Sequence, residues 1–137
     1  ALSSAASDVY KRQEHCDAIA KNLLVRDQKK RFYWLLVLYG EKRADLKTLK
    51  AQLGHGALSF AGAEDLAELL GLTPGSVTPF GALNDKEHRV TILLDEDYRG
   101  KLIGVHPNDN TATVWLPADA LVELLRQQGT TVEFIPF

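Results

Sequence analysis

The sequence predicts an α+β fold built around a mixed β-sheet, and three observations support this prediction. Apolar, β-branched and aromatic residues form several short runs of the kind found in strands. Three other segments repeat leucines at helical spacing. Strands and helices do not follow the regular βαβ alternation that builds a parallel sheet. We therefore expect a mixed sheet flanked by short helices.

The first forty residues are expected to contain a leader and a β-hairpin. Residues 1–13 are small and polar, so we expect a disordered or added leader, followed by a single domain at residues 14–137. One or two helical turns are expected at residues 14–20. Two strands then flank a charged turn, Asp27 to Lys30. The second strand, residues 32–38, is continuously apolar, which places it at the centre of the sheet.

Two short helices are expected in the middle of the chain, with a short strand at residues 57–60 between them. The first covers residues 45–54, where Asp45 is a suitable N-cap and Gly54 a suitable terminator. The second covers residues 63–71 and ends at Gly71. Both helices direct leucines toward the core, namely Leu46, Leu49 and Leu53 in the first and Leu66, Leu69 and Leu70 in the second.

The last fifty residues are expected to add four strands and one helix. Strands are predicted at residues 89–95, 101–107, 111–117 and 131–137, with a polar turn at 108–110 joining the middle pair. The helix covers residues 118–129, with Pro117 in its first turn and Gly129 after its end.

Composition favours a cytoplasmic protein with an ordinary core. The chain has 137 residues, of which 45% are hydrophobic, so one domain is the default. No apolar run approaches the roughly 18 residues of a membrane span, and the N-terminus lacks the apolar region of a signal peptide. The single cysteine, Cys16, excludes an internal disulfide and is typical of a reducing compartment.

The charges are divided unevenly along the chain. Residues 1–60 hold 11 Lys/Arg and 6 Asp/Glu, a net of +5, whereas residues 61–137 hold 5 and 12, a net of −7. A basic half can bind phosphate while the rest of the protein stays acidic. The alternative interpretation of the basic cluster around Lys29 and Lys30 is a solvated hairpin turn.

Conventional catalytic motifs are missing. The four histidines are His15, His55, His88 and His106, and they form no HExxH motif, nor is there a CxxC pair, so we expect no metal and no cofactor. There is no GxSxG elbow and no glycine-rich dinucleotide motif. Cys16 beside His15 is adjacency only, because neighbouring side chains diverge.

Three segments remain that carry little conventional acid–base machinery. Lys21 and Asn22 lie before a strand, and the nearly uncharged segment from Gly75 to Asp85 contains two glycines and Pro79. Glycines permit a close approach of the backbone, and proline stiffens it. The third segment places His106 before a proline, followed by a turn that contains Asn110.

In this order, the segments "KNLLVRDQKKRFYWLLVL", "LTPGSVTPFGALND" and "GVHPNDNTATV" resemble the prolyl-tRNA editing family of YbaK-like aminoacyl-tRNA deacylases. The resemblance extends from about Cys16 to Phe137 and is closest to the free-standing ProX branch. Its most specific motif is G-x-x-x-P, present as Gly75 to Pro79. Members of the family carry a longer segment before "KNL" than the 20 residues present here, so the chain is expected to be a shortened form.

The resemblance implies a mixed, partly barrel-like sheet and a trans-editing hydrolase that acts on mischarged proline tRNA, most often carrying alanine. Water attacks the activated ester with help from backbone N–H groups and a substrate hydroxyl. The implied partners are the acceptor end of the tRNA and prolyl-tRNA synthetase, with no membrane, and the protein is expected to be a monomer or weak dimer.

The resemblance also implies roles for individual residues. The catalytic group comprises Lys21, Gly75 and His106, of which Lys21 is a cation for the acceptor end. The substrate-binding group comprises Asn22, Ser76, Val77, Thr78, Pro79, Phe80, Asn110 and Thr111. Val77, Phe80 and Leu83 are expected to narrow the pocket so that it excludes proline. The pocket of a synthetase discriminates poorly against smaller amino acids, so editing needs a second, smaller pocket that rejects the correct amino acid by its size. The tRNA-binding group comprises Arg26, Lys29, Lys30 and Arg31.

Three alternatives stay open. A deacylase of the same class removes another small amino acid, such as cysteine. A non-catalytic module of the same fold binds tRNA or a synthetase. An orphan protein that binds a small ester or an amino acid has no affinity for tRNA.

Overall fold

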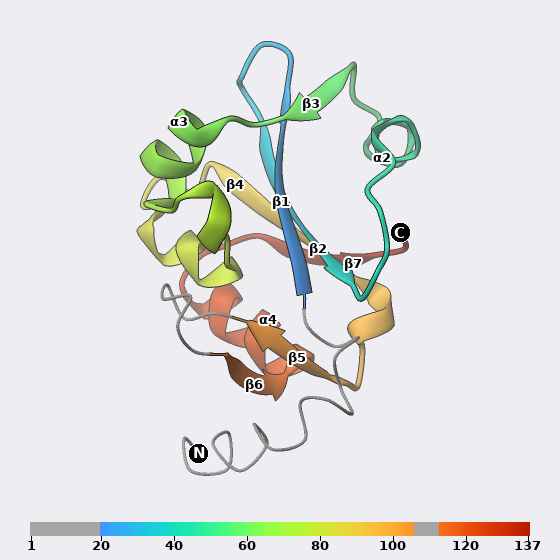
Figure 1. Cartoon of the computed structure of the whole chain (residues 1–137), viewed down its shortest axis with the longest axis vertical. Coiled ribbons are helices and arrows are strands. Elements are labelled where there is room, and N and C mark those ends of the chain that lie inside the picture. Colours follow the sequence, from blue (N-terminus) through green and yellow to red (C-terminus); the bar gives the residue numbers. More distant parts are fainter. Residues whose placement is uncertain (1–19, 106–112) are drawn as a thin grey trace.

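The computed structural model describes residues 20–105 and 113–137 (Figure 1). A five-stranded sheet has the order β3-β1-β2-β4-β7 and is formed by β1 (Ala20–Asp27), β2 (Tyr33–Tyr39), β3 (Leu58–Phe60), β4 (Val90–Asp95) and β7 (Val132–Ile135). β1 pairs antiparallel with β2 and β3, while the pairs β2–β4 and β4–β7 are parallel. The predictions of a mixed sheet and of a central apolar strand at β2 are confirmed.

A second, two-stranded sheet is formed by β5 (Leu102–Val105) and β6 (Val114–Pro117). The helices are α2 (Leu46–Leu53), α3 (Ala63–Asp65) and α4 (Ala118–Gln127). Shorter helical turns are η3 (Leu66–Leu70), η4 (Pro74–Ser76), η5 (Pro79–Asn84) and η6 (Glu96–Tyr98). Figure 1 shows α2 to one side of the sheet, and α3 with the turns that follow it to the other.

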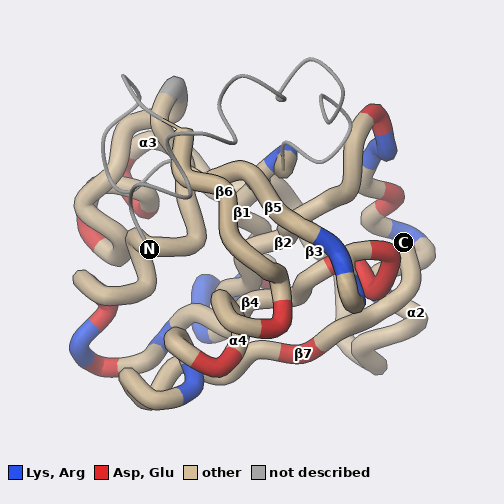
Figure 2. Tube along the Cα trace, turned by 90° about the horizontal axis from the view of Figure 1, so that it is seen from below, with Lys and Arg blue, Asp and Glu red and all other residues tan. Residues whose placement is uncertain are grey.

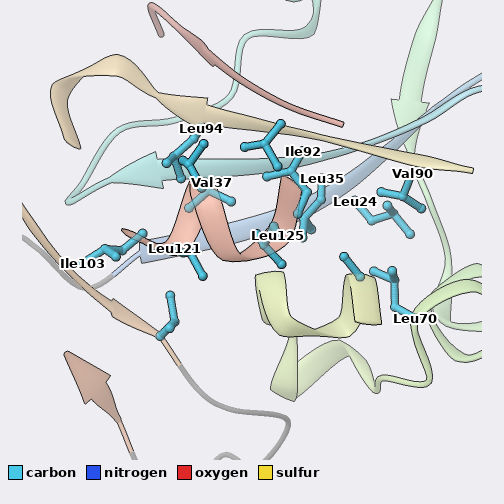
Figure 3. Close-up of a cluster of buried hydrophobic side chains, with 14 of the residues drawn as sticks. Leu24, Leu35, Val37, Leu70, Val90, Ile92, Leu94, Ile103, Leu121 and Leu125 are labelled. Carbon is cyan, nitrogen blue, oxygen red and sulfur yellow. The ribbon is translucent and has the colours of Figure 1, made fainter. Parts of the chain in front are cut away.

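Two clusters of apolar side chains hold these elements together, one on each face of the large sheet. The main cluster joins β2 and β4, through residues such as Leu35 and Ile92, to η3 and α4, through residues such as Leu70 and Leu121 (Figure 3). The second cluster contains Val25, Trp34, Leu36, Leu49 and Leu93 and includes α2. Strand alternation explains this division, because successive side chains point to opposite faces.

Helix α2 begins and ends as the sequence predicts. The Asp45 carboxylate accepts hydrogen bonds from the backbone N–H groups of Lys47 and Thr48. Gly54 has φ = 66°, a left-handed conformation that favours glycine. Hydrogen bonds from Thr48 and from the backbone lower the pKa of the Asp45 carboxyl below its ordinary value, so the cap stays ionised at neutral pH.

Two boundary predictions are wrong. Ala20 belongs to β1 rather than to a helical turn, so Lys21 and Asn22 lie within the strand instead of before it. Pro117 ends β6 and is the N-cap of α4 rather than part of its first turn. Residues 1–19 and 106–112, including the predicted leader and the 108–110 turn, lie outside the described residues. Within residues 20–105 and 113–137, no helix is both long and apolar enough to cross a membrane.

Candidate functional site

The segment from Gly75 to Asp85, whose glycines and Pro79 indicate a loop, is folded largely into the helical turns η4 and η5. Pro79 begins η5, and Thr78 is its N-cap, whose hydroxyl accepts a hydrogen bond from the Phe80 N–H at 3.4 Å. Thr78 and Pro79 are buried, while Ser76, Val77 and Phe80 are half-buried. Thr78 and Pro79 are therefore packed into the protein rather than exposed on a loop.

Gly81, the second glycine of the segment, allows η5 to pack closely against its neighbours. A Cβ at this position would lie 2.6 Å from Leu72 Cδ1 and 3.1 Å from Leu70 Cβ. Both distances are shorter than ordinary van der Waals contacts between carbon atoms. The close backbone approach expected from this glycine is therefore made to the protein core, through η3, rather than to a ligand.

Gly81→Ala is expected to lower the free energy of unfolding by about 1–2 kcal/mol, because the added methyl group overpacks this contact. Denaturant unfolding measures the effect. Gly56→Ala is the matched control, since a Cβ at Gly56 would meet nothing within 4 Å. Equal unfolding midpoints for the two variants would show that the contact relaxes without cost.

The far end of the segment is anchored to the sheet by Asp85. Its buried carboxylate accepts hydrogen bonds from the N–H groups of Arg89 (3.1 Å) and Val90 (2.8 Å). The neighbouring Asn84 side chain donates to the Leu70 carbonyl at 2.8 Å. These bonds connect η5 to β4 and to η3, so the predicted pocket wall is held on two sides.

Lys21 and Asn22 lie on opposite faces of β1. Ala20 and Leu24 pack against the main cluster, whereas Leu23 packs against the second cluster. Strand alternation therefore places Asn22 on the face of the main cluster and Lys21, which is exposed, on the other. The structure brings Asn22, but not the Lys21 side chain, to the face that η5 covers.

The Asn22 amide is incompletely satisfied. Its Nδ2 group is 3.5 Å from the Ala20 carbonyl, a long hydrogen bond, and its buried Oδ1 has no partner among the described residues. Val77 and Phe80 pack against the same main cluster. A buried amide oxygen without a partner costs about 1–3 kcal/mol, so this oxygen is available for a donor from a ligand.

The remaining predicted site residues are only partly placed. Gly75 lies in η4. Strand β5 contacts β1 and ends at Val105, the residue before His106. His106, Asn110 and Thr111 themselves lie outside the described residues. Among the described residues, no group of three or more His, Cys, Asp or Glu side chains is placed to hold a metal ion.

The four predicted tRNA-binding cations separate into two environments. Arg26 is partly buried, with its Nε 4.0 Å from Asp65 Oδ2, and the Tyr33 hydroxyl donates to the same carboxylate at 3.4 Å. Burial, together with the Asp65 charge, raises the pKa of the Tyr33 hydroxyl. Arg26 thus forms an ion pair within the protein.

The other three cations, Lys29, Lys30 and Arg31, are exposed on the turn between β1 and β2. This turn is at the top of Figure 1, at the opposite end of β1 from Lys21. The stretch of β1 from Lys21 to Asp27 covers roughly 20 Å of chain before the turn that carries Lys29 begins. Proximity in sequence therefore does not place these cations beside Lys21.

Sequence reasoning missed two residues near this turn, Phe32 and His55. With neighbouring residues of both segments they line a cavity of about 250 Å³; the lining residues are Asp27, Gln28, Lys29, Arg31, Phe32, His55, Gly56 and Ala57. We call this the hairpin-tip surface. Phe32 is next to a basic run, which is a visible signal, but His55 follows α2 and joins the surface only through the tertiary fold.

A larger open groove, of about 810 Å³, lies between α4 and β7. Both signs of charge line it, and Figure 2 shows acidic residues along α4 and β7. Its arginines have partners within the protein: the Arg99 guanidinium lies 4.2 Å from the centre of the Phe134 ring, and Arg126 donates to the Val132 carbonyl at 2.7 Å. This groove lacks the free cations that would bind a phosphate.

Comparison with known proteins identifies related sequences and folds. Residues 3–124 match the family model of the aminoacyl-tRNA editing domain. The chain is 42% identical over 123 residues to the Prolyl-tRNA editing protein ProX of Acetoanaerobium sticklandii, covering 89% of this chain and 75% of that protein. It is 30% identical over 117 residues to the Prolyl-tRNA synthetase associated domain-containing protein 1 of Bos taurus, covering 82% and 68%.

Solved structures share the fold. A protein described as a proposed trans-editing enzyme for prolyl-tRNA synthetase aligns with a TM-score of 0.69 and 25% identity, over 98% of this chain and 82% of that one. The hypothetical protein APE2540 aligns with a TM-score of 0.68 and 20% identity, over 90% and 79%. The α+β prediction, with the mixed sheet and short helices of this fold family, is confirmed.

Proposed function

Because the chain belongs to the aminoacyl-tRNA editing domain family, we propose that it is a trans-editing hydrolase that removes alanine from mischarged proline tRNA. Membership confirms the resemblance noted in the sequence and the prediction of an aminoacyl-tRNA deacylase. The observation that carries the choice of proline tRNA is the 42% identity to a protein named for prolyl-tRNA editing.

The proposed chemistry needs no strong nucleophile, because an aminoacyl ester is already activated. Water attacks the ester carbonyl, and preorganised donors stabilise the oxyanion that develops. Gly75 in η4 is the proposed source of a backbone donor. A ribose hydroxyl of the substrate assists in placing the water. His106 is proposed to shape the pocket or to contact the polar end of the substrate, and Asn110 and Thr111 are proposed to hold the segment that carries His106.

Asn22 is the proposed residue for holding the aminoacyl group. Its buried Oδ1 lacks a partner among the described residues. The α-ammonium group of an aminoacyl ester can donate a hydrogen bond to this oxygen. Val77 and Phe80, which are half-buried and pack against the same cluster, form the proposed wall with Ser76, Thr78 and Pro79. A wall anchored by buried residues is rigid enough to exclude a larger side chain.

Lys21 is the proposed contact for the acceptor-end phosphate. It is exposed and forms no ion pair within the described part of the chain, so its three donors are free for an anion. Lys21 and Asn22 lie on opposite faces of β1, so they can contact two different parts of one substrate. Asn22 would hold the aminoacyl group on one face, and Lys21 would bind the nucleotide that carries it on the other.

Wild-type protein is expected to release alanine from alanyl-tRNA(Pro) and to leave prolyl-tRNA(Pro) intact, because the proposed wall of Val77 and Phe80 excludes the larger proline side chain. The measurement follows both labelled esters, with cysteinyl-tRNA(Pro) as a third substrate. Faster loss of cysteine than of alanine would transfer the proposal to another small amino acid. Loss of neither would contradict hydrolysis.

A second candidate is a non-catalytic module that binds prolyl-tRNA synthetase. It is favoured by one observation, the similarity to relatives named Prolyl-tRNA synthetase associated domain-containing protein 1. This candidate predicts that the protein co-purifies with the synthetase while all three esters stay intact. Hydrolysis without binding to the synthetase would exclude it.

A further inference from the structure

The hairpin-tip surface contains Lys29 and Arg31, with Lys30 beside them on the same turn, and the nearby acidic residue is directed inward. Asp27 Oδ1 accepts hydrogen bonds from the N–H groups of Arg31 (2.7 Å) and Phe32 (3.0 Å). The hydrogen bond from the Phe32 N–H lowers the pKa of the Asp27 carboxyl most, and the bond from the Arg31 N–H lowers it further, so the pKa stays below its ordinary value. The carboxylate therefore organises the turn, while Lys29, Lys30 and Arg31 remain exposed around it.

An exposed aromatic ring lies beside these cations. Phe32 is 48% exposed, which is unusual for a large apolar side chain on a well-packed sheet. It stacks on Trp34, with the ring centroids 6.1 Å apart and an angle of 24° between the planes. His55 packs edge-on against both rings, at 4.9 Å and 4.8 Å. Contacts with Trp34 and His55 thus hold the Phe32 ring in place.

A second exposed ring stands on the same face of the sheet. Val25 pairs with Trp34 on one side and with Phe60 on the other, and directly paired residues share a face. Phe60 is 52% exposed. The face that carries the hairpin-tip surface therefore presents two aromatic rings to solvent.

The shape and charge of this surface favour nucleic acid as its ligand. A cavity of about 250 Å³ is smaller than the roughly 300–1,000 Å³ of ordinary small-molecule pockets, but it is open beside a fixed ring. Flat rings flanked by lysine and arginine bind unpaired bases by stacking and their phosphates by charge. A small ester bound near Asn22 would not reach it, because the stretch of β1 from Asn22 to Asp27 is roughly 16 Å long.

We propose that the hairpin-tip surface binds the body of the tRNA whose 3′ end occupies the site near Asn22. An unpaired nucleotide stacks on Phe32 and His55, and its flanking phosphates contact Lys29, Lys30 and Arg31. This inference rests on the proposed function, since it requires an RNA substrate. The surface supplies affinity for the whole tRNA and takes no part in hydrolysis.

The test compares two substrates of different length. On full-length alanyl-tRNA(Pro), Phe32→Leu is expected to raise the half-saturating concentration roughly ten-fold, with an unchanged rate at saturation. On the alanyl ester of adenosine, which cannot span β1, the variant is expected to equal wild type. Phe32→Tyr keeps the ring and is expected to bind full-length tRNA like wild type.

Charge variants give an independent measurement. Lys29→Gln is expected to weaken binding of uncharged tRNA(Pro) and to reduce the slope of log affinity against log salt by about 1. Lys47→Gln, which removes an equally exposed lysine from the first turn of α2, is the matched control and is expected to leave the slope unchanged. Thermal unfolding of each variant checks that the fold is retained.

The outcomes separate this inference from the proposed function. If wild type hydrolyses alanyl-tRNA(Pro) while Phe32→Leu and Lys29→Gln match it on every substrate, the hairpin-tip surface is not an RNA contact and the proposed function stands. If the variants instead lose binding to prolyl-tRNA synthetase alone, the surface docks protein and the inference is wrong. If wild type neither binds nor hydrolyses the tRNA, both proposals fail.

Discussion

Replacing Lys21 by alanine is expected to slow hydrolysis of alanyl-tRNA(Pro) about a hundred-fold, the usual size of the loss when one charged or oriented donor is removed from a reacting substrate. The lysine is exposed and has no ion pair within the described residues, so its truncation leaves the core intact. The loss is expected without a change in the free energy of unfolding. Single-turnover kinetics with excess enzyme measures it.

Lys21→Arg is the informative companion variant. It keeps the charge but replaces a compact ammonium by a planar fork, so partial activity is expected if the lysine binds a phosphate. Equal rates for wild type, Lys21→Ala and Lys21→Arg would remove Lys21 from the site. Asn22→Ala tests the other face of β1. This variant is expected to slow hydrolysis of alanyl-adenosine by a larger factor than it weakens the binding of uncharged tRNA.

Asp95→Ala is expected to lower the free energy of unfolding by about 3 kcal/mol. Asp95 is completely buried, and its carboxylate accepts hydrogen bonds from the N–H groups of Tyr39 (3.0 Å) and Asp97 (3.1 Å). Lys42 Nζ lies 2.9 Å from the same carboxylate. Truncation removes the acceptor of the Tyr39 and Asp97 N–H groups, at about 1–3 kcal/mol for each buried group, while Lys42 keeps its ion pair with Asp97. Denaturant unfolding at neutral pH measures the loss.

Asp97→Asn is the control for this network, because Asp97 is about half exposed and its ion pair with Lys42 is on the surface. Exposed pairs contribute about 0–1 kcal/mol, so a small effect is expected. A loss as large as that of Asp95→Ala would mean that the exposed pair, rather than the buried carboxylate, stabilises this end of the sheet.

The same network gives stability a pH dependence with a definite sign. The hydrogen bond from Lys42 lowers the pKa of Asp97 below 3.8, so its contribution is present above that pH and is lost as the pH falls through the lowered value. Burial opposes the charge on Lys42, but hydrogen bonds to Asp97 and Asp95 outweigh it and raise its pKa above 10.5. That contribution is lost as the pH rises through the raised value.

The candidate site shows where sequence reasoning succeeds and where it stops. Apolar runs on either side of a charged turn, the second of them continuous, predict β1 and β2, and leucine spacing with Asp45 and Gly54 predicts α2. The segment after Gly75 is correctly marked as special by its glycines and Pro79. Its helical turns were not predicted, because short turns with few internal hydrogen bonds are stabilised by packing, here of Gly81 against Leu70 and Leu72.

The placement of charges shows the same limit. The basic run from Arg26 to Arg31 is evident in the sequence, but the partner of Arg26 is Asp65, which is 39 positions away along the chain. His55 reaches Phe32 only because β3 returns along β1 after α2. Contacts between distant segments depend on loop closure and side-chain packing, which local patterns do not encode.

By itself, the sequence determined the class of fold, the central strand, the caps of α2 and the family, because periodicity, capping and ordered motifs are local properties of the chain. The tertiary structure alone decided which side chains meet. It separated Lys21 from Asn22 by the faces of one strand, and it set the three exposed cations on the turn beyond the far end of β1, roughly 20 Å of strand from Lys21. It left the buried Asn22 oxygen without a partner among the described residues, because strand pairing and the packing of helical turns from distant parts of the chain set its surroundings.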